Sequence, residues 1–344
     1  MNLSKVLAFC VILTVPVVSA VAQLRTPTLL VLNKGANELA IVDPLAKKVL
    51  GRVPTGEDPH SVAASTDGKL AFVGNTSGGK GMGSISVIDL VAQKELRRVN
   101  LGPHTRPHGL AFAAGKLYFT AEGYKMIGCY NPDTDQIEWL LGTGQGQTVL
   151  IAVNKEANRI FTANVTSNSV TAIDVGAGAL ASNPTNWNQT VIPVTTQPHG
   201  IAVSPDGKEV WVAGRLDGHV TIIDAASKKI LQTLDLPSWK AGERMAFTPD
   251  GKRVVIPNSG VDDNTGGGGE FVLLDVASRK EIKRILIGPS RHLEEVIIPP
   301  EGSVAYVAVS AENGVAVIDL KTLEVTGRIP TGKTPEGMAW ANGS

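Results

Sequence analysis

The sequence has few of the residues and none of the short motifs that mark several common protein classes. Lysine plus arginine and aspartate plus glutamate number 32 each, so there is no basic surplus of the kind that nucleic-acid-binding surfaces show. We therefore expect no nucleic-acid partner. The motifs G-x-S-x-G, H-E-x-x-H and C-x-x-C are all missing, which argues against α/β-type serine hydrolases, zincins and thioredoxin-like redox proteins.

Cysteine is also scarce, with two residues, and aromatic residues make up only 5% of the chain. Cys10 lies in an apolar run near the start, so removal of that segment would leave Cys129 alone and without a disulfide partner. Because Cys129 lies in an apolar strand-like stretch with no neighbouring base, we interpret it as a small core residue and not a nucleophile.

Residues 1–22 have the features of a secretory signal peptide. Lys5 precedes an apolar run from Val6 to Val18, and Ala20-Val21-Ala22 forms a small-residue cleavage site. The run is shorter than the roughly 20 residues that span a bilayer. We expect an exported protein, periplasmic or extracellular, with no membrane span after cleavage and with a single domain over residues 23–344.

A unit of several short strands recurs about every 42 to 51 residues, which is the signature of a repeat architecture. Its clearest marker is an apolar strand that ends in aspartate, with one degenerate copy that ends in asparagine. The seven copies end at Asp43, Asp89, Asn131, Asp174, Asp224, Asp275 and Asp319.

One unit, residues 199–235, is readable strand by strand. Its first two strands are joined by Ser204-Pro205-Asp206-Gly207-Lys208, in which proline presets φ and glycine supplies a positive φ. Two further strands follow, so each unit predicts four antiparallel strands, as in a propeller blade.

The pattern resembles the YVTN-type β-propeller repeat family, whose repeat includes an S-P-D-G-K turn and a V-x-V-I-D strand. The resemblance covers essentially the whole chain after residue 22. It implies an all-β, seven-bladed propeller. Members of the family and its relatives include surface-layer proteins, periplasmic proteins and propeller lactonases, so the resemblance is specific for fold and leaves function open.

Counting the strands predicts how the ring closes. Six full blades begin near residues 60, 108, 149, 199, 243 and 294. The remaining strands are three at the N-terminus, residues 28–33, 38–43 and 47–53, and one at the C-terminus, which begins at Glu336. Together they would complete a seventh blade and leave no exposed sheet edge.

The first residue of each innermost strand should lie at the mouth of the central channel. In chain order these residues are His60, His108, Val149, His199, Glu243, Glu294 and Glu336. Imidazole and carboxylate are ligands for zinc, iron, copper or manganese, and they also serve as general bases and acids. The three histidines are therefore candidate ligands for one divalent metal ion, and the three glutamates are candidate catalytic residues.

Crowded carboxylates repel each other, and a metal ion, a shared proton or a cationic ligand would each relieve that cost. Four further polar residues near the ring are candidate ligand-binding residues: Arg106, Arg244, Arg291 and His292. The arginines could hold a substrate carboxylate or phosphate, or they could neutralise the glutamates.

Two functional hypotheses follow. In the first, the protein is a binding or interaction module that holds a small molecule, polymer or protein at the channel mouth. In the second, it is a metal-assisted lactonase or lyase in which a histidine-bound cation polarises a carbonyl and a glutamate acts as base. The first is favoured because nothing beyond the ring identifies a reaction, and a repeat consensus can also explain His and Glu at these positions.

Overall fold

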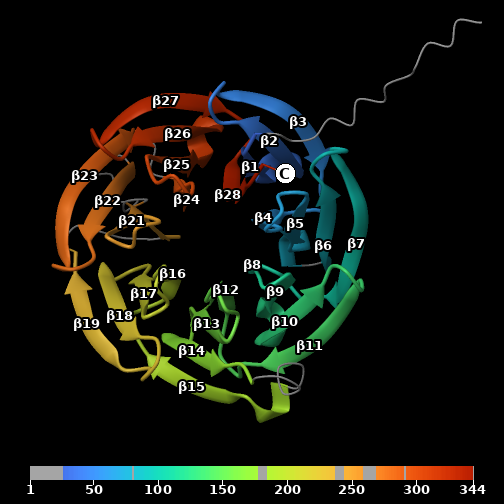
Figure 1. Cartoon of the computed structure of the whole chain (residues 1–344). Coiled ribbons are helices and arrows are strands. Elements are labelled where there is room, and N and C mark those ends of the chain that lie inside the picture. The colour runs from blue at the N-terminus through green and yellow to red at the C-terminus, as the bar shows by residue number, and fades with distance from the viewer. Residues whose placement is uncertain are drawn as a thin grey trace, which may run out of the picture.

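A computed structural model describes residues 26–79, 81–176, 184–236, 244–258, 269–289 and 292–343. The expected signal peptide, Glu243 and Arg291 lie outside these ranges. Within them, seven sheets of four antiparallel strands are arranged radially around a central axis (Figure 1). The chain is a seven-bladed β-propeller. The predicted fold class is confirmed.

Each blade runs from an innermost strand at the axis to an outermost strand at the rim. The closing blade consists, in that order, of β28 (Pro335–Ala341), β1 (Thr28–Asn33), β2 (Glu38–Asp43) and β3 (Lys48–Pro54). The second blade contains β4 (Pro59–Ala64), β5 (Leu70–Asn75), β6 (Met82–Asp89) and β7 (Lys94–Pro103). The third contains β8 (Leu110–Ala113), β9 (Lys116–Ala121), β10 (Met126–Asn131) and β11 (Gln136–Gly142). The fourth contains β12 (Thr148–Val153), β13 (Arg159–Asn164), β14 (Ser169–Asp174) and β15 (Asn188–Pro193).

The fifth blade contains β16 (Pro198–Val203), β17 (Glu209–Gly214), β18 (His219–Asp224) and β19 (Ile230–Asp235). The sixth contains β20 (Ala246–Phe247), β21 (Arg253–Asn258), β22 (Gly269–Asp275) and β23 (Lys280–Gly288). The seventh contains β24 (Leu293–Ile297), β25 (Val304–Val309), β26 (Gly314–Asp319) and β27 (Glu324–Pro330). Short 3₁₀ turns are η1 (Lys34–Ala36), η2 (Ser77–Gly79), η3 (Glu122–Tyr124), η5 (Pro184–Asn186) and η6 (Ser310–Glu312).

The predicted turn between β16 and β17 shows how local sequence shapes each blade. The hydroxyl of Ser204 donates to Asp206 at 2.7 Å and accepts from the backbone N–H of Glu209 at 3.0 Å. Gly207 has a φ of 70°, which glycine adopts without strain. This self-contained set of hydrogen bonds reverses the chain without help from neighbouring blades.

The core lies between the blades. Leu30 and Leu32 of the closing blade pack against Val62 and Val73 of the β4–β7 blade, all of them buried. The opposite side of β1 packs against Tyr306 and its neighbours in the β24–β27 blade. Each sheet is therefore covered on both sides by apolar side chains, which favours the packed ring over separate blades.

Cys129 belongs to this core, as predicted. Its side chain is fully buried and unpaired. Burial, together with the nearby Glu138, raises the pKa of its thiol to about 12, so it is not a nucleophile at neutral pH.

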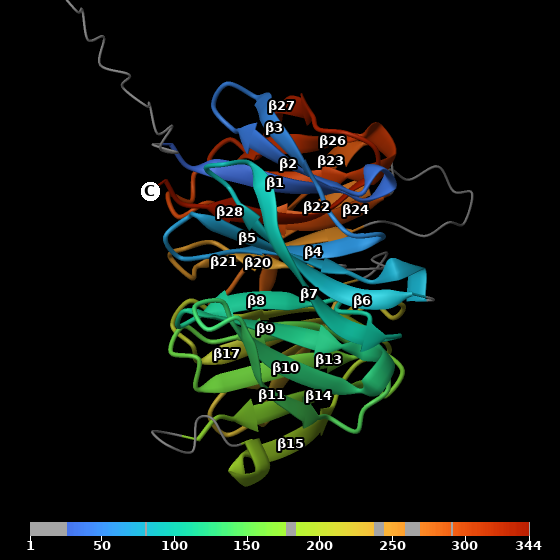
Figure 2. The ribbon, with the colours of Figure 1, turned by 90° about the vertical axis from the view of Figure 1, so that its right-hand side faces the viewer.

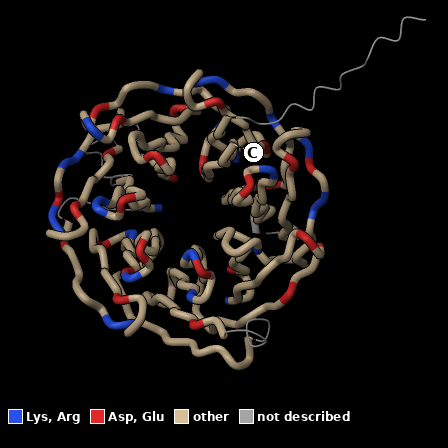
Figure 3. Tube along the Cα trace, in the orientation of Figure 1, with Lys and Arg blue, Asp and Glu red and all other residues tan. Residues whose placement is uncertain are grey.

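Charged residues of both signs are distributed around the whole ring (Figure 3). Viewed edge on, the blades form a disc whose outer rim is crossed by strands such as β7 (Figure 2). In the part of the chain that the structure describes, no helix is long and apolar enough to cross a bilayer.

Ring closure follows the prediction. Strand β1 pairs with β28 from Thr28 opposite Ala341 to Asn33 opposite Pro335. Two backbone hydrogen bonds extend the pairing, from the N–H of Lys34 to the carbonyl of Thr334 and from Gly35 to Lys333. The two ends of the chain are therefore joined within one sheet.

We predict that a chain ending at Thr334 loses cooperative folding, with a loss of about 5 kcal/mol or more in the free energy of unfolding. Removal of β28 would expose one edge of β1 and uncover the cores on both sides of the closing blade. Thermal and urea unfolding followed by circular dichroism would measure the change. A chain ending at Asn342 is the control and should unfold like the full chain. Parent-like unfolding of the shorter chain would contradict the closure.

Candidate functional site at the centre of the ring

Five of the predicted channel residues are each the second residue of an innermost strand: His60, Val149, His199, Glu294 and Glu336. His108 lies two residues before β8. His60, Val149 and His199 each fall at a register shift in the pairing between the first and second strands of their blades. Such a bulge leaves a residue out of the ladder and redirects its side chain. The residue two positions earlier has a positive φ of 49° to 54° in five blades: Asp58, Arg106, Gln147, Gln197 and Thr334.

Close packing of neighbouring backbones brings these residues together. A Cβ at Gly337 would lie 2.5 Å from the carbonyl oxygen of His60, and one at Gly109 would lie 2.6 Å from that of Val149. Only glycine fits such an approach. Gly109 and Gly337, which follow His108 and Glu336, therefore allow adjacent inner strands to converge.

Side chains from six blades line one polar pocket of about 260 Å³, which we call the central pocket. Its lining residues are Lys34, His60, His108, His199, Arg215, Arg244, Glu294 and Glu336. Of the predicted site residues, the three histidines, Arg244, Glu294 and Glu336 are brought together there.

His60 lies between two carboxylates. Its Nδ1 contacts Glu336, and its Nε2 lies 3.3 Å from Asp58 Oδ2. Asp58 is itself fixed by the hydroxyl of Thr76 and by the N–H of Gly78, which donates at 3.2 Å. Only 13% of the His60 side chain and 19% of the Glu336 side chain are exposed. The imidazole is thus held in one orientation.

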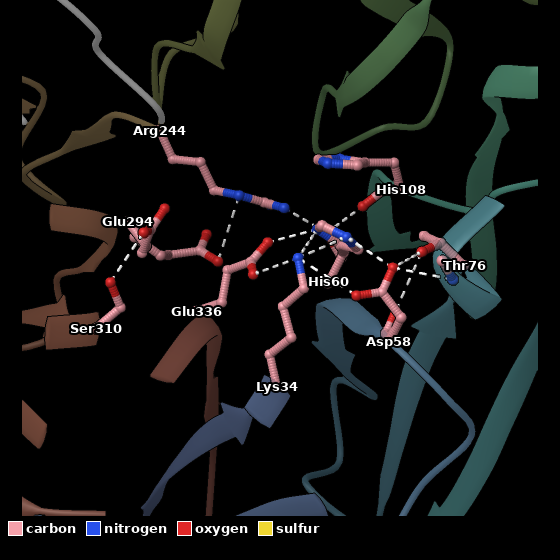
Figure 4. Close-up of polar contacts among 12 residues, drawn as sticks. Lys34, Asp58, His60, Thr76, His108, Arg244, Glu294, Ser310 and Glu336 are labelled. Atoms are coloured by element: carbon pink, nitrogen blue, oxygen red, sulfur yellow. Dashed lines mark hydrogen bonds and ion pairs between the residues drawn. The ribbon is translucent and has the colours of Figure 1, made fainter. Parts of the chain in front are cut away.

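Lys34 completes this cluster (Figure 4). Its Nζ lies 2.9 Å from His60 Nε2, 3.0 Å from Glu336 Oε2 and 3.4 Å from Asp58 Oδ1. An ammonium only donates, so the contact with His60 requires a neutral ring that carries its proton on Nδ1, toward Glu336. When His60 is protonated, Nε2 donates to Asp58 instead.

The pKa values in the cluster follow these contacts. Burial opposes the charge on His60, but its bonds to Asp58 and Glu336 raise its pKa above the usual value. The bond to His60 is the main cause of the pKa of Asp58 lying well below its usual value. Burial works to raise the pKa of Glu336, yet His60 and Lys34 together lower it. Both carboxyl groups are therefore ionised at neutral pH.

His108 behaves in the opposite way. Its ring centroid lies 4.4 Å from that of His60 and 5.9 Å from that of His199. Burial, reinforced by the charges of His60, His199 and Arg244, places its pKa well below the usual value. Its Nδ1 is buried without a hydrogen-bond partner among the described residues. His108 is therefore a neutral imidazole.

Arg244 spans the pocket from the segment before β20. Its guanidinium donates to the hydroxyl of Ser61, and its Nε lies 3.5 Å from Glu295 Oε2. Burial raises the pKa of Glu295 even though Arg244 works against that rise. Ser61 in turn donates to the carbonyl of His108, so Arg244 links the two sides of the ring.

Two other predicted residues are placed away from the pocket lining. Arg106 turns to Glu122, with 3.2 Å between Nη1 and Oε1. His292 accepts a hydrogen bond at its carbonyl from the N–H of Ser310. Ser310 also donates its hydroxyl to Glu294 at 3.0 Å.

Sequence reasoning missed Lys34, Asp58 and Arg215. Lys34 and Arg215 share one repeat position, the residue directly after the second strand. Antiparallel pairing places this position beside the start of the first strand. The described residues at this position are Lys34, Thr76, Glu122, Val165, Arg215 and Ser310. Aligning the ends of the second strands could have identified this second ring.

Comparisons with known proteins support the fold. No protein-family model matches the chain. A curated relative, Antigen Lp49 of Leptospira interrogans, is 25% identical over 199 residues, which is 50% of this chain and 40% of the antigen. The match therefore spans less than half the length of that relative.

Solved structures match nearly the whole ring. A candidate 6-phosphogluconolactonase from Bacteroides fragilis has a TM-score of 0.72 at 14% identity, covering 92% of this chain and 98% of that one. The periplasmic gluconolactonase PpgL of Pseudomonas aeruginosa has a TM-score of 0.71 at 17% identity, covering 92% and 99%. The dihydro-heme d1 dehydrogenase NirN has a TM-score of 0.63 at 15% identity, covering 92% and 75%. At these identities the likeness establishes the fold alone.

The cluster generates a prediction on acid stability. The unfolded-state pKa of aspartate is about 3.9, and the folded-state value of Asp58 lies below it. The stability that Asp58 contributes is therefore present above about pH 4 and is lost as the pH falls toward the folded-state pKa. We expect Asp58→Asn, which tolerates the positive φ, to lose about 1–3 kcal/mol at pH 7, with a smaller difference from the parent below pH 4.

Urea unfolding at pH 7 and at pH 3 would measure both differences. Asp133→Asn, at an exposed turn, is the matched control and should follow the parent at both pH values. An Asp58→Asn variant as stable as the parent at pH 7 would contradict the network.

Proposed function

We propose that the protein binds a small, anionic, polyhydroxylated molecule of the sugar-acid class in the central pocket. The observation that carries the proposal is the convergence of three cations, Lys34, Arg215 and Arg244, on a pocket that also contains three histidines and two glutamates. Cationic side chains recognise carboxylate and phosphate groups through charge-assisted hydrogen bonds.

The size and polarity of the pocket support a ligand of this class. A volume of about 260 Å³ lies below the roughly 300–1,000 Å³ of sites for drug-sized molecules, so the ligand is small. The carboxylates of Glu294 and Glu336 accept hydrogen bonds, which suits the hydroxyl groups of a sugar acid. An apolar ligand would bring nothing to hydrogen-bond with the charged groups that line the pocket.

The roles of the cations differ. Lys34 is engaged by three acceptors, and Arg244 is engaged by Ser61 and Glu295. Arg215 belongs to a different blade and occupies the same repeat position as Lys34. Both guanidinium groups line the pocket, and we infer that Arg215 and Arg244 contact the anionic group of the ligand.

We predict that Arg215→Met weakens the binding of gluconate or 6-phosphogluconate by about 10- to 100-fold, the usual effect of losing a hydrogen bond to a charged group. Calorimetric titration with gluconate, 6-phosphogluconate and glucose would measure it. Lys208→Met, in the turn at the opposite end of the same blade, should bind like the parent. Equal binding of glucose and gluconate by the parent would overturn the proposed charge recognition.

Lactone hydrolysis is a second candidate, favoured by the neutral imidazole of His108 in a pocket that two arginines also line. In this reaction His108 takes a proton from water as the oxygen of that water bonds to the lactone carbonyl carbon. Arg215 and Arg244 stabilise the oxyanion that forms. The ring C–O bond then breaks, and the leaving oxygen takes the proton from His108, which gives a hydroxy acid. Two solved structures with the same fold are described as gluconolactonases or candidates for that activity, which agrees with this reaction.

We predict that His108→Asn lowers kcat for gluconolactone hydrolysis by about 10²–10⁴-fold, the usual contribution of a general base. Because the pKa of His108 is well below its usual value, the parent should keep its activity in mildly acidic buffer. A pH-indicator assay would follow both. His219→Asn, a histidine of β18 outside the pocket, should leave kcat unchanged. No hydrolysis by the parent would leave binding as the function.

We also propose that the chain is exported through residues 1–22 and that its repeats are of the YVTN type. The signal-peptide pattern of the sequence supports export, and the turn and strand motifs of the blades support the repeat assignment.

A further inference from the structure

One cluster in the central pocket has the composition of a metal site, except that it also contains a lysine. Its residues are His60, His108, Glu336 and Lys34. One donor atom from each of His60, His108 and Glu336 lies within 4.8 Å of the other two. Nitrogen and carboxylate donors of this kind suit zinc, cobalt or manganese. The ammonium of Lys34 contacts two of these three residues, so it competes with any metal ion for them.

The three N–H groups of Lys34 meet three acceptors, at 2.9 Å in His60, 3.0 Å in Glu336 and 3.4 Å in Asp58. One of these contacts is a hydrogen bond and the other two are ion pairs, so all three residues hold the ammonium. A metal ion that bound His60 Nε2 and Glu336 would have to displace the ammonium from both. The donor set with Lys34 in place does not fit a divalent ion.

We propose that Lys34 is a built-in cation that takes the place of a metal ion in this site, and that a shorter, neutral side chain at position 34 converts the same residues into a transition-metal site. This role of Lys34 is independent of the proposed ligand and reaction, because it concerns only which cation balances the cluster.

Charge balance supports the proposal. The carboxylates of Glu336 and Asp58 both face the same ammonium, at 3.0 Å and 3.4 Å from its nitrogen. Without Lys34, two carboxylates would share the site with no fixed positive charge between them unless His60 gained a proton. Such a site is costly unless a cation binds. A divalent ion would neutralise both carboxylates and leave His60 neutral, which is the form that ligates metals.

The backbone keeps the ammonium in place. The N–H of Lys34 donates to the carbonyl of Thr334 at 3.0 Å, and that of Gly35 donates to Lys333 at 3.1 Å. Both acceptors lie just before β28, the strand that carries Glu336. Lys34 and Glu336 are thus held against each other by ring closure, and a tethered ammonium competes with a free ion at a high effective concentration.

Small movements would suffice to close a metal site. Zinc–nitrogen distances of 2.0–2.1 Å place tetrahedral ligands about 3.3 Å apart. The donor atoms of His60, His108 and Glu336 are within 4.8 Å of one another, so side-chain rotations into the space left by Lys34 can bring them to that spacing. Asp58, 3.4 Å from the present ammonium, is placed to become a fourth ligand.

The test is a titration of the purified chain with Zn²⁺ by calorimetry and with Co²⁺ by visible absorption. We expect Lys34→Ala to bind one equivalent of either ion about 100-fold or more tighter than the parent, because it loses a unit charge a few ångströms from the ion. The double variant that carries both Lys34→Ala and His60→Ala should lose that metal binding. Lys125→Ala, which removes a surface-loop lysine, is the matched control and should behave like the parent.

The effect of Zn²⁺ on the melting temperature is a second measurement, made on the parent and on the variant. The melting temperature of the parent should not rise with Zn²⁺, whereas that of folded Lys34→Ala should rise by mass action. One equivalent of metal in the parent that disappears in His60→Ala would overturn the proposal, as would a folded Lys34→Ala variant without metal binding. Neither readout uses sugar acids or lactones, so a failure here is distinguishable from a failure of the proposed function.

Discussion

The pairing of β28 with β1 is the interaction on which the rest of the structure depends. It joins the two ends of the chain in one sheet, removes the free edges of an open array and lets apolar cores form on both sides of the closing blade. It also brings together two residues of the site that are far apart in the sequence. Lys34 directly follows β1 and Glu336 is the second residue of β28, so ring closure also forms the central cluster.

The central pocket is built from a backbone irregularity that recurs from blade to blade around the axis. At the start of an inner strand the ladder skips a residue, and that residue points toward the axis. In two blades this residue is followed by a glycine, Gly109 or Gly337, that lets neighbouring strands approach closely. Because the skipped residue makes few ladder contacts, its identity is set by the chemistry at the axis and not by the sheet. Histidine, valine and glutamate therefore all occur at this position.

Much of the fold could be predicted from the sequence, because turns such as Ser204–Lys208 and the aspartate-ended strands are local signals that recur at a fixed period. The ring of residues at the starts of the inner strands, such as His60 and His199, was predictable for the same reason. Lys34 and Arg215 were harder to find, since their repeat position holds a different residue type in each blade and lacks a motif. Asp58 reaches His60 because its φ is positive, a conformation that the residue type alone does not announce. The residues after the second strands contact those at the starts of the first strands because of the strand register, which is seen only in the folded propeller.

The arrangement of charge explains how one scaffold can serve different chemistries. In this chain the cation nearest the imidazole–carboxylate pair is the ammonium of Lys34, which is held by His60, Glu336 and Asp58. Arg215 and Arg244 bring two further positive charges to the same pocket, and burial keeps the imidazole of His108 neutral beside them. A ring in which position 34 were small would instead gather its carboxylates around a bound ion. A single residue after the first strand of the chain would thus decide between charge balance by lysine and charge balance by metal, while every blade stays the same.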